Sequence, residues 1–538
     1  MIAKTYTCSL LGIDAILVEV EVDLASGLPG FSTVGLPDNI VKESKDRVKA
    51  AIQNSGYPFP FERITVNLAP AALKKEGAGF DLPIAVGILA ALGIVNAEKA
   101  AGIVFAGELS LDGRVKPVPG CLPMAITARD SGYKDIILPA ENAQEAAVLT
   151  EVGERKTEGG RRNTEDGIPV PCPPSSVICP PFSVRPVKHL AEVVEFLNGR
   201  SDLPVFKTDL DAIWKSEAPD ELDFEDVKGQ EHAKRGLEVA AAGSHNVLMI
   251  GPPGSGKTML AQRLSGILPP LSFDEALETS KIFSVAGMLN NNPLVVKRQF
   301  RAPHHTISDA GLVGGGHFPR PGEVSLAHNG VLFLDEFPEF RRSVLDLLRQ
   351  PLEDGQVTIA RAAISLSYPA RFMLIGAMNP CPCGHSGDPV KPCTCPARTI
   401  QRYRGRISGP ILDRIDLHIE VPAVKYEQLR AEGESEKSDA VRARVSAARE
   451  IQLQRFSGEG IYSNSQMKPK HLKRFCQLDP ACQSILDQAV RQLGLSARAY
   501  HRILKVSRTA ADLEAQENIG SMHLLEAIQY RSLDRKLF

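Results

Sequence analysis

The sequence has little net charge and no segment that is apolar enough, over a sufficient length, to cross a membrane. Its 62 Lys and Arg residues nearly balance its 64 Asp and Glu residues, for a formal net charge of −2. A nucleic-acid-binding surface would therefore have to be local. The longest apolar run, Leu82 to Val95, is too short for a bilayer and predicts a buried helix. The N-terminal residues lack the pattern of a signal peptide, so we expect a cytoplasmic protein.

The ten cysteines are unevenly distributed, with four of them inside fifteen residues. In a cytoplasmic protein we expect them to be free or metal-bound rather than paired in disulfides. Four thiolates can bind Zn²⁺ tetrahedrally and order a polar loop. The C-x-C spacing departs from the usual C-x2-C, His385 could replace one cysteine, and a reduced loop or a redox pair are the alternatives. The predicted zinc ligands are Cys381, Cys383, Cys393 and Cys395.

Alternating strand-like and helix-like segments predict two α/β domains followed by a helical region that lacks strand-like segments. A stretch rich in Gly, Pro and charge interrupts the first domain and is interpreted as a flexible surface insertion. The expected boundaries are 1–185 for the first domain with its insertion at 153–186, 186–222 for a helix and linker, 223–425 for the second domain, and 426–538 for the helical region.

The strongest motif follows an apolar segment at 247–250 and reads GPPGSGKT. Its glycines allow backbone N–H groups to turn toward phosphate oxygens, and the helix that follows adds its positive dipole end. Lys257 is expected to contact the β- and γ-phosphates, and Thr258 to hold Mg²⁺. The sequence therefore predicts a site for Mg-ATP. Its predicted nucleotide-binding residues are Gly251, Gly254, Ser255, Gly256, Lys257, Thr258 and Asp335.

Acidic and polar side chains follow two further strand-like segments. Asp335 and Glu336 come directly after Val331–Leu334. We expect Asp335 to orient Mg²⁺, and Glu336 to activate the attacking water as general base. Asn379 ends the next such segment and is expected to reach the γ-phosphate or orient the water, which is a feature of the AAA+ ATPases.

Two arginines complete the resemblance to AAA+ proteins. Arg414, in ISGPILDRIDL, is interpreted as an arginine that reaches a neighbouring subunit's nucleotide, with a structural salt bridge as the alternative. Arg498 lies in the first turn of the predicted helix LSARAYHRILKVSRTAADL. In AAA+ proteins, an arginine at the start of the third lid helix senses the γ-phosphate.

The resemblance extends over nearly the whole chain. The segments from RAPHHTISDAGLVGGG through MNPCPCG to YRGRISGPILDRIDLHIEV resemble the bacterial magnesium-chelatase-like AAA+ proteins of the ComM/YifB type. This resemblance implies a homohexameric ATPase with a helical lid. It also implies a DNA helicase that promotes branch migration when incoming single-stranded DNA is integrated during natural transformation.

The resemblance also implies two insertions in the ATPase core that project into a central pore in related helicases. GLVGGGHFPRPGEVSLAHNG resembles a helix-2 insert, and VTIARAAISLSYPA is interpreted as the pre-sensor-1 β-hairpin. Cationic side chains neutralise phosphates and aromatic ones stack on bases, although a loop arginine can equally be only solvated. The predicted contacts to single-stranded or branched DNA are His317, Phe318, Arg320 and Arg361.

The N-terminal domain resembles the α/β domain of Lon-type proteases, a fold related to a ribosomal-protein domain. Gly79 stands where the serine nucleophile would be, and Leu122 is near the place of the lysine base. A hydroxyl nucleophile needs an adjacent base, so we expect an inactive protease-like fold. The adjacent Lys74 and Lys75 are expected on the solvated surface, with contact to phosphate as the alternative. An ATP-dependent protease, a chelatase-type protein remodeller and a non-catalytic scaffold remain the alternatives to a DNA motor.

Overall fold

The structure, a computed structural model, divides into two compact units that are described separately. Unit 1 comprises residues 1–217 and 276–296, and unit 2 comprises residues 218–275 and 297–538. The structure describes residues 2–72, 74–75, 77–157, 182–215, 222–289, 292–316, 320–360, 365–387, 391–423 and 436–531, with only the backbone at 151–157 and 215. Most of the predicted insertion at 153–186 therefore lies outside the described residues. No helix among them is long and apolar enough to span a membrane.

Unit 1 is built on a seven-stranded mixed sheet with the order β3-β4-β2-β1-β5-β8-β9. The long strands β1 and β2 pair antiparallel over ten residue pairs, because the chain reverses at the turn between them. Alternate residues of β2 are buried, as expected for a strand with one face on the core. The strands are β1 (Ile2–Leu11), β2 (Asp14–Ala25), β3 (Gly30–Val34), β4 (Arg63–Ala69), β5 (Ile103–Phe105), β8 (Asp135–Pro139) and β9 (Ser183–Val187).

The helices of unit 1 cover this sheet, and α2 is its most buried element. Every residue of α2 (Asp81–Ala91) is buried, which confirms the buried helix predicted from the apolar run. The expectation of a surface Lys75 was wrong, because its side chain is buried and donates a hydrogen bond to the Pro70 carbonyl. The remaining helices are α1 (Asn39–Asn54), α3 (Ala97–Ala101), α4 (Cys121–Asp130), α5 (Ala143–Thr157), α6 (Leu190–Leu197) and α7 (Leu210–Lys215).

A segment that follows the phosphate loop in sequence belongs to unit 1. Helix α10 (Phe273–Ala286) begins in unit 2, but residues 276–296 group with unit 1. The Ser284 carbonyl accepts a hydrogen bond from Gly120 N at 2.9 Å, and the Ser284 hydroxyl bonds the buried Glu145 carboxylate. Lys281 Nζ lies 2.6 Å from Asp14 Oδ1. Nothing in the sequence pattern indicated this attachment.

Unit 2 contains a five-stranded parallel sheet with the order β11-β14-β17-β10-β18. Every residue of β10 and β14 is buried, as is typical of central parallel strands covered on both faces. Both strands have the bounds expected from the sequence. The strands are β10 (Val247–Ile250), β11 (Phe300–Arg301), β14 (Val331–Leu334), β17 (Met373–Met378) and β18 (Leu417–Glu420).

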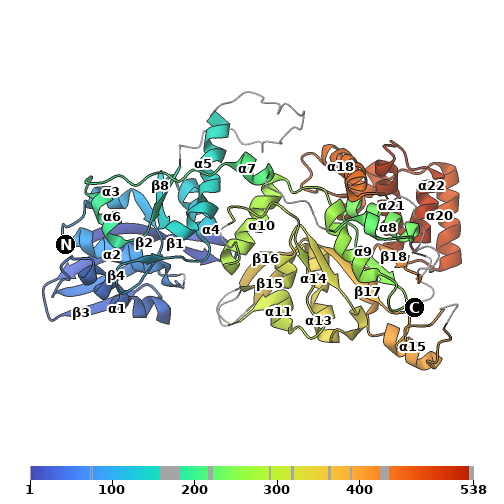
Figure 1. Cartoon of the computed structure of the whole chain (residues 1–538), viewed down its shortest axis with the longest axis horizontal. Helices are drawn as coiled ribbons and strands as arrows, with labels where there is room; N and C mark the ends of the chain where they lie inside the picture. The colour runs from blue at the N-terminus through green and yellow to red at the C-terminus, as the bar shows by residue number, and fades with distance from the viewer. Residues whose placement is uncertain are drawn as a thin grey trace. The chain divides into compact units, whose positions relative to one another are not determined.

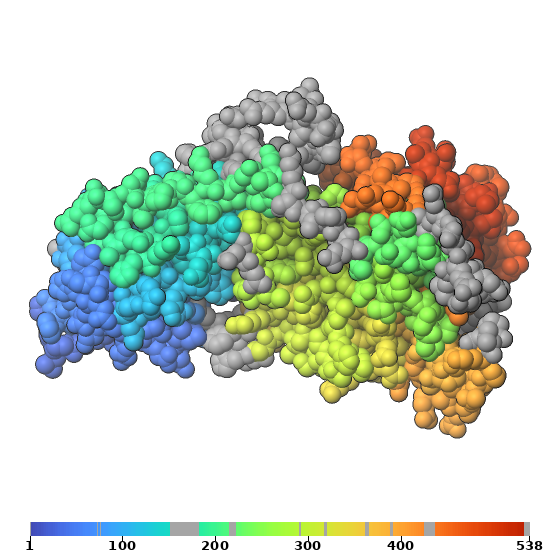
Figure 2. All heavy atoms as spheres, in the orientation of Figure 1, coloured from blue at the N-terminus to red at the C-terminus, as the bar shows by residue number. Residues whose placement is uncertain are grey.

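Two hairpins extend from this unit, at the places where insertions were expected. Strands β12 (Gly314–Gly315) and β13 (Arg320–Pro321) form one, and β15 (Gln356–Ala360) and β16 (Ser365–Pro369) form the other. The helices around the sheet are α8 (Glu231–Gly243), α9 (Lys257–Arg263), α11 (Asp309–Val313), α12 (Glu323–Leu326), α13 (Arg342–Leu347), α14 (Arg349–Asp354), α15 (Ala397–Arg404) and α16 (Gly409–Leu412). Helix α15 projects from the rest of unit 2 (Figure 1) and forms a lobe of its own in the space-filling view (Figure 2).

The C-terminal part of unit 2, from residue 436 on, contains helices and no strand among its described residues, which agrees with the helical region expected from the sequence. The core of this region joins apolar side chains of these helices to those of α8 and the parallel sheet. The helices are α18 (Ser438–Arg455), α19 (Pro469–Phe475), α20 (Pro480–Leu493), α21 (Ala497–Leu513) and α22 (Ser521–Gln529). The structure is thus a mixed α/β protein with a helical C-terminus.

Candidate nucleotide site

The order of the parallel strands brings the predicted site residues to one edge of the unit 2 sheet. Strand β17 lies between β10 and β14, so Asn379 is placed between the loop after β10 and the acids after β14. The chain continues from β10 to the far side of the sheet and later returns to β18 on the other side of β10. Such a switch point at the carboxyl ends of parallel strands is where ligands bind in open α/β sheets.

The phosphate loop has the backbone conformation that its glycines were expected to allow. Gly254 and Gly256 have φ values of 74° and 88°, in the left-handed region that favours glycine. A Cβ on Gly251 would lie 2.0 Å from the Val421 carbonyl oxygen, so only glycine fits there. Its glycines therefore give the loop a conformation in which backbone N–H groups can turn toward a phosphate.

Lys257 is the first residue of α9, directly after this loop, and its side chain contacts the residue that follows β17. Its Nζ donates to the carbonyl oxygens of Gly251 and Pro252 at 2.8 and 2.9 Å and lies 3.2 Å from Asn379 Oδ1. Burial lowers the pKa of Lys257, and the carboxylate of Asp335 opposes this shift. The ammonium is thus held by neutral oxygens that an anionic phosphate could replace.

The hydroxyl and carboxylate expected at the metal also meet. Thr258 Oγ1 donates to Asp335 Oδ2 at 2.8 Å, and the backbone N–H of Glu336 donates to Asp335 Oδ1 at 2.8 Å. Oxygen ligands of this kind suit Mg²⁺. Glu336 itself has φ 51° and ψ 43°, a left-handed conformation that costs a non-glycine residue about 1–2 kcal/mol. Backbone strain of this kind concentrates at functional sites.

These residues line one cavity of about 670 Å³. Residues of the phosphate loop, Asp335, Glu336 and Asn379 form part of its wall. The segment after β11 forms another part, with His304 and His305, and the sequence analysis did not identify either histidine as a site residue. The sequence carried no signal for them, because the strand before them, β11, is only two residues long and is not apolar.

The two predicted arginines lie outside the cavity of their own chain. Arg414 pairs with Glu353 of α14, so the salt bridge that the sequence left as the alternative is present within the chain, and it donates to the Pro410 carbonyl, in a second cavity of unit 2. Arg498 lies in the first turn of α21, and its Nη1 lies 3.1 Å from Asp413 Oδ2. Neither arginine is among the residues that line the cavity beside the phosphate loop.

The predicted DNA contacts are described only in part. Arg320 is exposed on β13, in the hairpin that follows α11. His317, Phe318 and Arg361 lie outside the described residues. Their part in a DNA interface stays a prediction.

The four cysteines of the predicted zinc site come together directly after Asn379. Their sulfur atoms all lie within 4.8 Å of one another. The Cys381 sulfur lies 3.4 Å from that of Cys383 and 3.6 Å from that of Cys393, and Cys383 and Cys393 are also 3.6 Å apart. Tetrahedral zinc with bonds of about 2.3 Å requires sulfur–sulfur distances of about 3.8 Å, so the donor set fits the metal.

The electrostatics of this cluster also suit a bound cation. Backbone N–H groups of His385 and Thr394 and the Cys381 thiol lower the pKa of Cys383 to about 6. The backbone N–H of Cys395 favours the Cys393 thiolate, but burial and the neighbouring thiols raise the pKa of Cys393 to about 12. One thiolate thus forms readily and disfavours the next, unless a metal ion compensates the charge.

The cysteine loop contacts the phosphate loop. A Cβ on Gly384 would lie 2.4 Å from Pro253 Cδ, so the two loops pack closely at this glycine. Arg404 of α15 donates to the Pro380 carbonyl at 3.1 Å. The cysteine loop therefore connects α15, Asn379 and the phosphate loop.

The two positions that would carry the serine and the lysine of a Lon-type protease hold a glycine and a leucine. Gly79 lies in a short 3-10 helix at Ala78–Phe80, and Leu122 is buried in α4. A hydroxyl nucleophile with an adjacent base is therefore not formed by these two positions.

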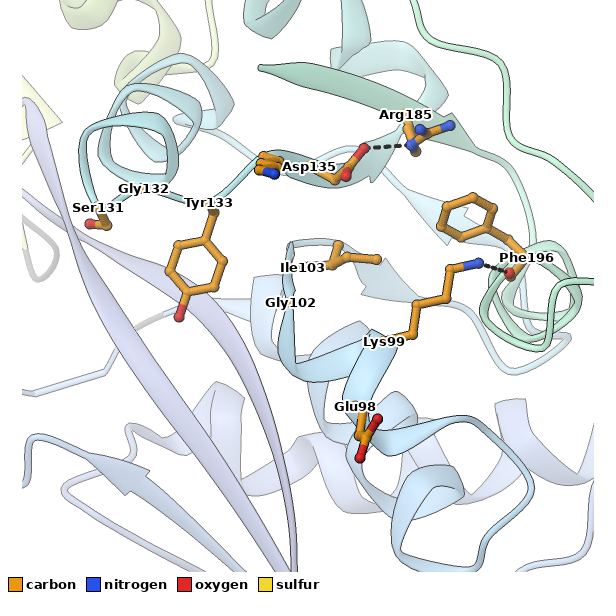
Figure 3. A pocket seen from close by; sticks show the side chains of 11 residues that line it. Glu98, Lys99, Gly102, Ile103, Ser131, Gly132, Tyr133, Asp135, Arg185 and Phe196 are labelled. Atoms are coloured by element: carbon orange, nitrogen blue, oxygen red, sulfur yellow. Dashed lines mark hydrogen bonds and ion pairs between the residues drawn. The ribbon is translucent and has the colours of Figure 1, made fainter. Parts of the chain in front are cut away.

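Unit 1 contains a cavity of about 740 Å³ (Figure 3). Its charged side chains bond to groups of the same wall, with Arg185 Nε 2.6 Å from Asp135 Oδ1 and Lys99 Nζ donating to the Phe196 carbonyl at 2.5 Å. Lys99 Nζ also lies 4.0 Å from the centre of the Phe196 ring. These contacts account for the cations as structural groups, and we assign no chemistry to this cavity.

Comparison with known proteins identifies the family. Residues 223–429 match the family described as magnesium chelatase, subunit ChlI, and residues 20–142 match subunit ChlI of Mg-chelatase. Residues 435–531 match the magnesium chelatase subunit ChlI C-terminal family. Competence protein ComM of Haemophilus influenzae is 45% identical over 540 residues, which cover 100% of this chain and 98% of that protein. The chain belongs to the ComM/YifB-type magnesium-chelatase-like family.

Other members of this family and a true chelatase subunit show how far the likeness extends. YifB of Escherichia coli is 43% identical over 99% of this chain and 97% of its own length. The magnesium-chelatase 38 kDa subunit of Cereibacter sphaeroides is 24% identical over only 39% of this chain. Membership of the ComM/YifB-type family indicates an ATPase that uses Mg²⁺, which agrees with the residues gathered around the cavity.

Proposed function

We propose that this ComM/YifB-type protein is an ATP-driven motor that acts on DNA as a homohexameric ring. The observation that carries the proposal is the meeting of Lys257, Thr258, Asp335, Glu336 and Asn379 around one cavity at the switch point of the parallel sheet. Three strands that are far apart in the sequence supply these groups.

The chain's own residues divide the chemistry of ATP hydrolysis among them. The loop at 251–256 and Lys257 bind the phosphates, while Thr258 and Asp335 hold Mg²⁺. Bound Mg²⁺ neutralises charge that develops on the phosphate oxygens. Glu336 accepts the proton of the attacking water, and Asn379 orients that water.

Arg414 acts on a neighbouring subunit's nucleotide, and Arg498 senses the γ-phosphate. Neither arginine lines its own chain's nucleotide cavity, which supports a role of Arg414 in trans. An arginine supplied by a neighbour stabilises the charge of phosphoryl transfer and couples adjacent subunits. Hydrolysis would therefore require the assembled ring.

The DNA-binding part of the proposal rests on the two hairpins and on the relative named competence protein ComM. We propose that His317, Phe318, Arg320 and Arg361 contact single-stranded or branched DNA, and that the ring drives branch migration during the integration of transforming DNA. Because cationic groups bind phosphates and aromatic ones stack on bases, these side chains suit a single strand.

We also propose that the four cysteines hold a structural Zn²⁺. The observation that supports this metal is the set of sulfur–sulfur distances of 3.4–3.6 Å. Its position beside Asn379 suggests that it keeps the cysteine loop in contact with the phosphate loop.

The experiment that tests the motor is ATP hydrolysis by the full chain, with and without single-stranded and three-way-branched DNA. The same samples are scored for strand displacement from the branched substrate. Lys257→Ala should abolish both activities, whereas Lys42→Ala, an exposed lysine of α1, is the matched control and should retain them. A rate of ATP hydrolysis that does not change with DNA, together with no strand displacement, would refute the DNA motor and favour a chelatase-like remodeller of proteins.

A further inference from the structure

The lobe formed by α15 presents arginines that the nucleotide chemistry does not use. Arg398 and Arg402 lie one turn apart on α15, and Arg406 follows two residues after the end of this helix. All three are exposed, whereas Tyr403 on the other side of the helix is buried (Figure 2). Residues four positions apart share one side of a helix, so Arg398 and Arg402 lie on the same face. The segment 396–409 contains four arginines and no acidic residue.

A cavity beside the lobe brings two of these arginines together with a third. Arg342 at the start of α13, Arg402 and Arg406 line a cavity of about 430 Å³. Glu339 is the acidic residue of its wall, and its Oε2 lies 2.5 Å from Arg406 Nη1. Within the described ranges of the chain, neither Arg342 nor Arg402 forms an ion pair. The cavity wall therefore carries two cations that no carboxylate neutralises. We refer to Arg342, Arg398, Arg402 and Arg406 as the arginine surface.

The composition of the arginine surface indicates which class of partner it fits. The centre of a protein–protein interface is formed by large apolar and aromatic side chains. None of the exposed large apolar side chains among the described residues belongs to 338–342 or 396–409. The two aromatic residues of these segments, Phe340 and Tyr403, are buried, so no ring is available to stack on the bases of a single strand. Guanidinium groups bind phosphates, and duplex DNA has a higher density of backbone phosphates than a single strand.

The arginine surface is attached to the residue that contacts Lys257. Arg404 of α15 donates to the Pro380 carbonyl. Burial raises the pKa of Tyr403 to about 12, and a hydrogen bond from the backbone N–H of Asn379 opposes this shift. Asn379 Oδ1 in turn lies 3.2 Å from Lys257 Nζ. A ligand bound by α15 would therefore be held by a helix that contacts the nucleotide site directly.

We propose that the arginine surface binds the phosphate backbone of duplex DNA. This inference rests on the proposed function, because it assumes that the protein acts on branched DNA, and it adds a surface for the duplex arm of that substrate. The hairpins would contact the single strand, whereas the α15 lobe contacts the duplex. Because the contacts go to phosphates, binding is independent of the base sequence and weakens as the salt concentration rises.

The experiment is equilibrium binding of a fluorescent duplex of mixed sequence to the full chain, without nucleotide, over a range of salt concentrations. The variant Arg342→Ala/Arg402→Ala removes the two unpaired cations of the cavity. Its affinity for the duplex should fall by about 10- to 50-fold at about 50 mM salt, and the slope of log K against log salt should become shallower by about 1.8. Arg342→Lys/Arg402→Lys retains both charges and should retain most of the affinity and the slope.

The matched control is Arg63→Ala/Arg491→Ala. It removes two exposed arginines that lie outside the arginine surface and form no ion pair within the described part of the chain. Its duplex affinity and its salt slope should equal those of the wild-type protein. An equal loss of affinity in this control would show that any two surface cations matter alike, and it would refute the inference.

Two further measurements separate duplex binding from other roles of these arginines. The rate of ATP hydrolysis without DNA and the oligomeric state in sedimentation should be the same in Arg342→Ala/Arg402→Ala as in the wild-type protein. The affinity for a single strand of the same sequence should change by less than about threefold. A change of oligomeric state would mean that the arginines contact a neighbouring subunit, and an equal loss for the single strand would contradict the assignment to duplex DNA. Either result would refute the inference.

The outcomes also distinguish this inference from the proposed function. If the wild-type protein displaces strands but Arg342→Ala/Arg402→Ala binds the duplex with unchanged affinity and slope, the motor proposal survives and the inference is refuted. If that variant loses duplex affinity but the wild-type protein displaces no strand, the arginine surface is supported and the motor proposal fails.

Discussion

The loss of a single cysteine from the four-cysteine cluster should release the metal. The sulfur–sulfur distances of 3.4–3.6 Å among Cys381, Cys383 and Cys393 are slightly below the value of about 3.8 Å for tetrahedral zinc. Structural zinc sites of this type contribute about 10–16 kcal/mol, so each of four thiolates supplies about 2.5–4 kcal/mol. Cys393→Ser should therefore weaken zinc affinity by about 100- to 1,000-fold.

The assay is the metal content of the purified full chain after gel filtration, followed by zinc release on titration with a thiol reagent. We expect one zinc ion per chain, and we expect the reagent to modify four thiols for each zinc ion that is released. The matched control is Cys476→Ser, a buried cysteine that follows α19 outside the cluster and whose substitution should leave the metal content unchanged. Zinc-free protein from zinc-supplemented cells, or a Cys393→Ser protein that retains its zinc, would refute the reasoning.

Four further substitutions test other contacts of the structure. Gly384→Ala should weaken ATP binding measured by titration, because a Cβ there would press on the phosphate loop; unchanged affinity would exclude that coupling. Arg414→Ala rings should be inactive, but they should regain ATP hydrolysis when mixed with Lys257→Ala subunits, which still supply Arg414 to their neighbours. If mixing restores no hydrolysis, Arg414 acts within its own chain. Ser284→Ala should lower the unfolding free energy of unit 1 by about 1–3 kcal/mol in denaturant titrations, because it removes a donor from the buried Glu145 carboxylate. Burial raises the pKa of Glu145 above 4.5, so the folded state binds its proton more tightly than the unfolded state. That contribution is present below pH 4.5 and is lost as the pH rises through the raised value, and Glu145→Gln should flatten this part of the stability profile.

The sequence alone was sufficient for the parts of the site that are made by consecutive residues. The phosphate loop could be located because its glycines, Lys257 and Thr258 occur within one turn between a strand and a helix. The apolar segments that became β10 and β14 also had the expected bounds, because strands buried on both faces are continuous apolar runs. Local chemistry of this kind is independent of the rest of the chain.

The departures from expectation involve contacts between distant segments. The sequence could not place Lys75 in a buried position, since its neighbours there come from other elements. It also gave no reason to assign residues 276–296 to unit 1, because the hydrogen bonds of Ser284 are made with residues more than one hundred positions away.

Amino-acid order determined which residues of this protein can bind a nucleotide and which cysteines can bind a metal. Only the tertiary structure decided which of them meet. The insertion of β17 between β10 and β14 places Asn379 beside Lys257, and the pairing of β11 with β14 places His305 beside Glu336. The physical reason is that the order of parallel strands depends on the packing of their crossover connections over the whole sheet, which no local pattern of residues records.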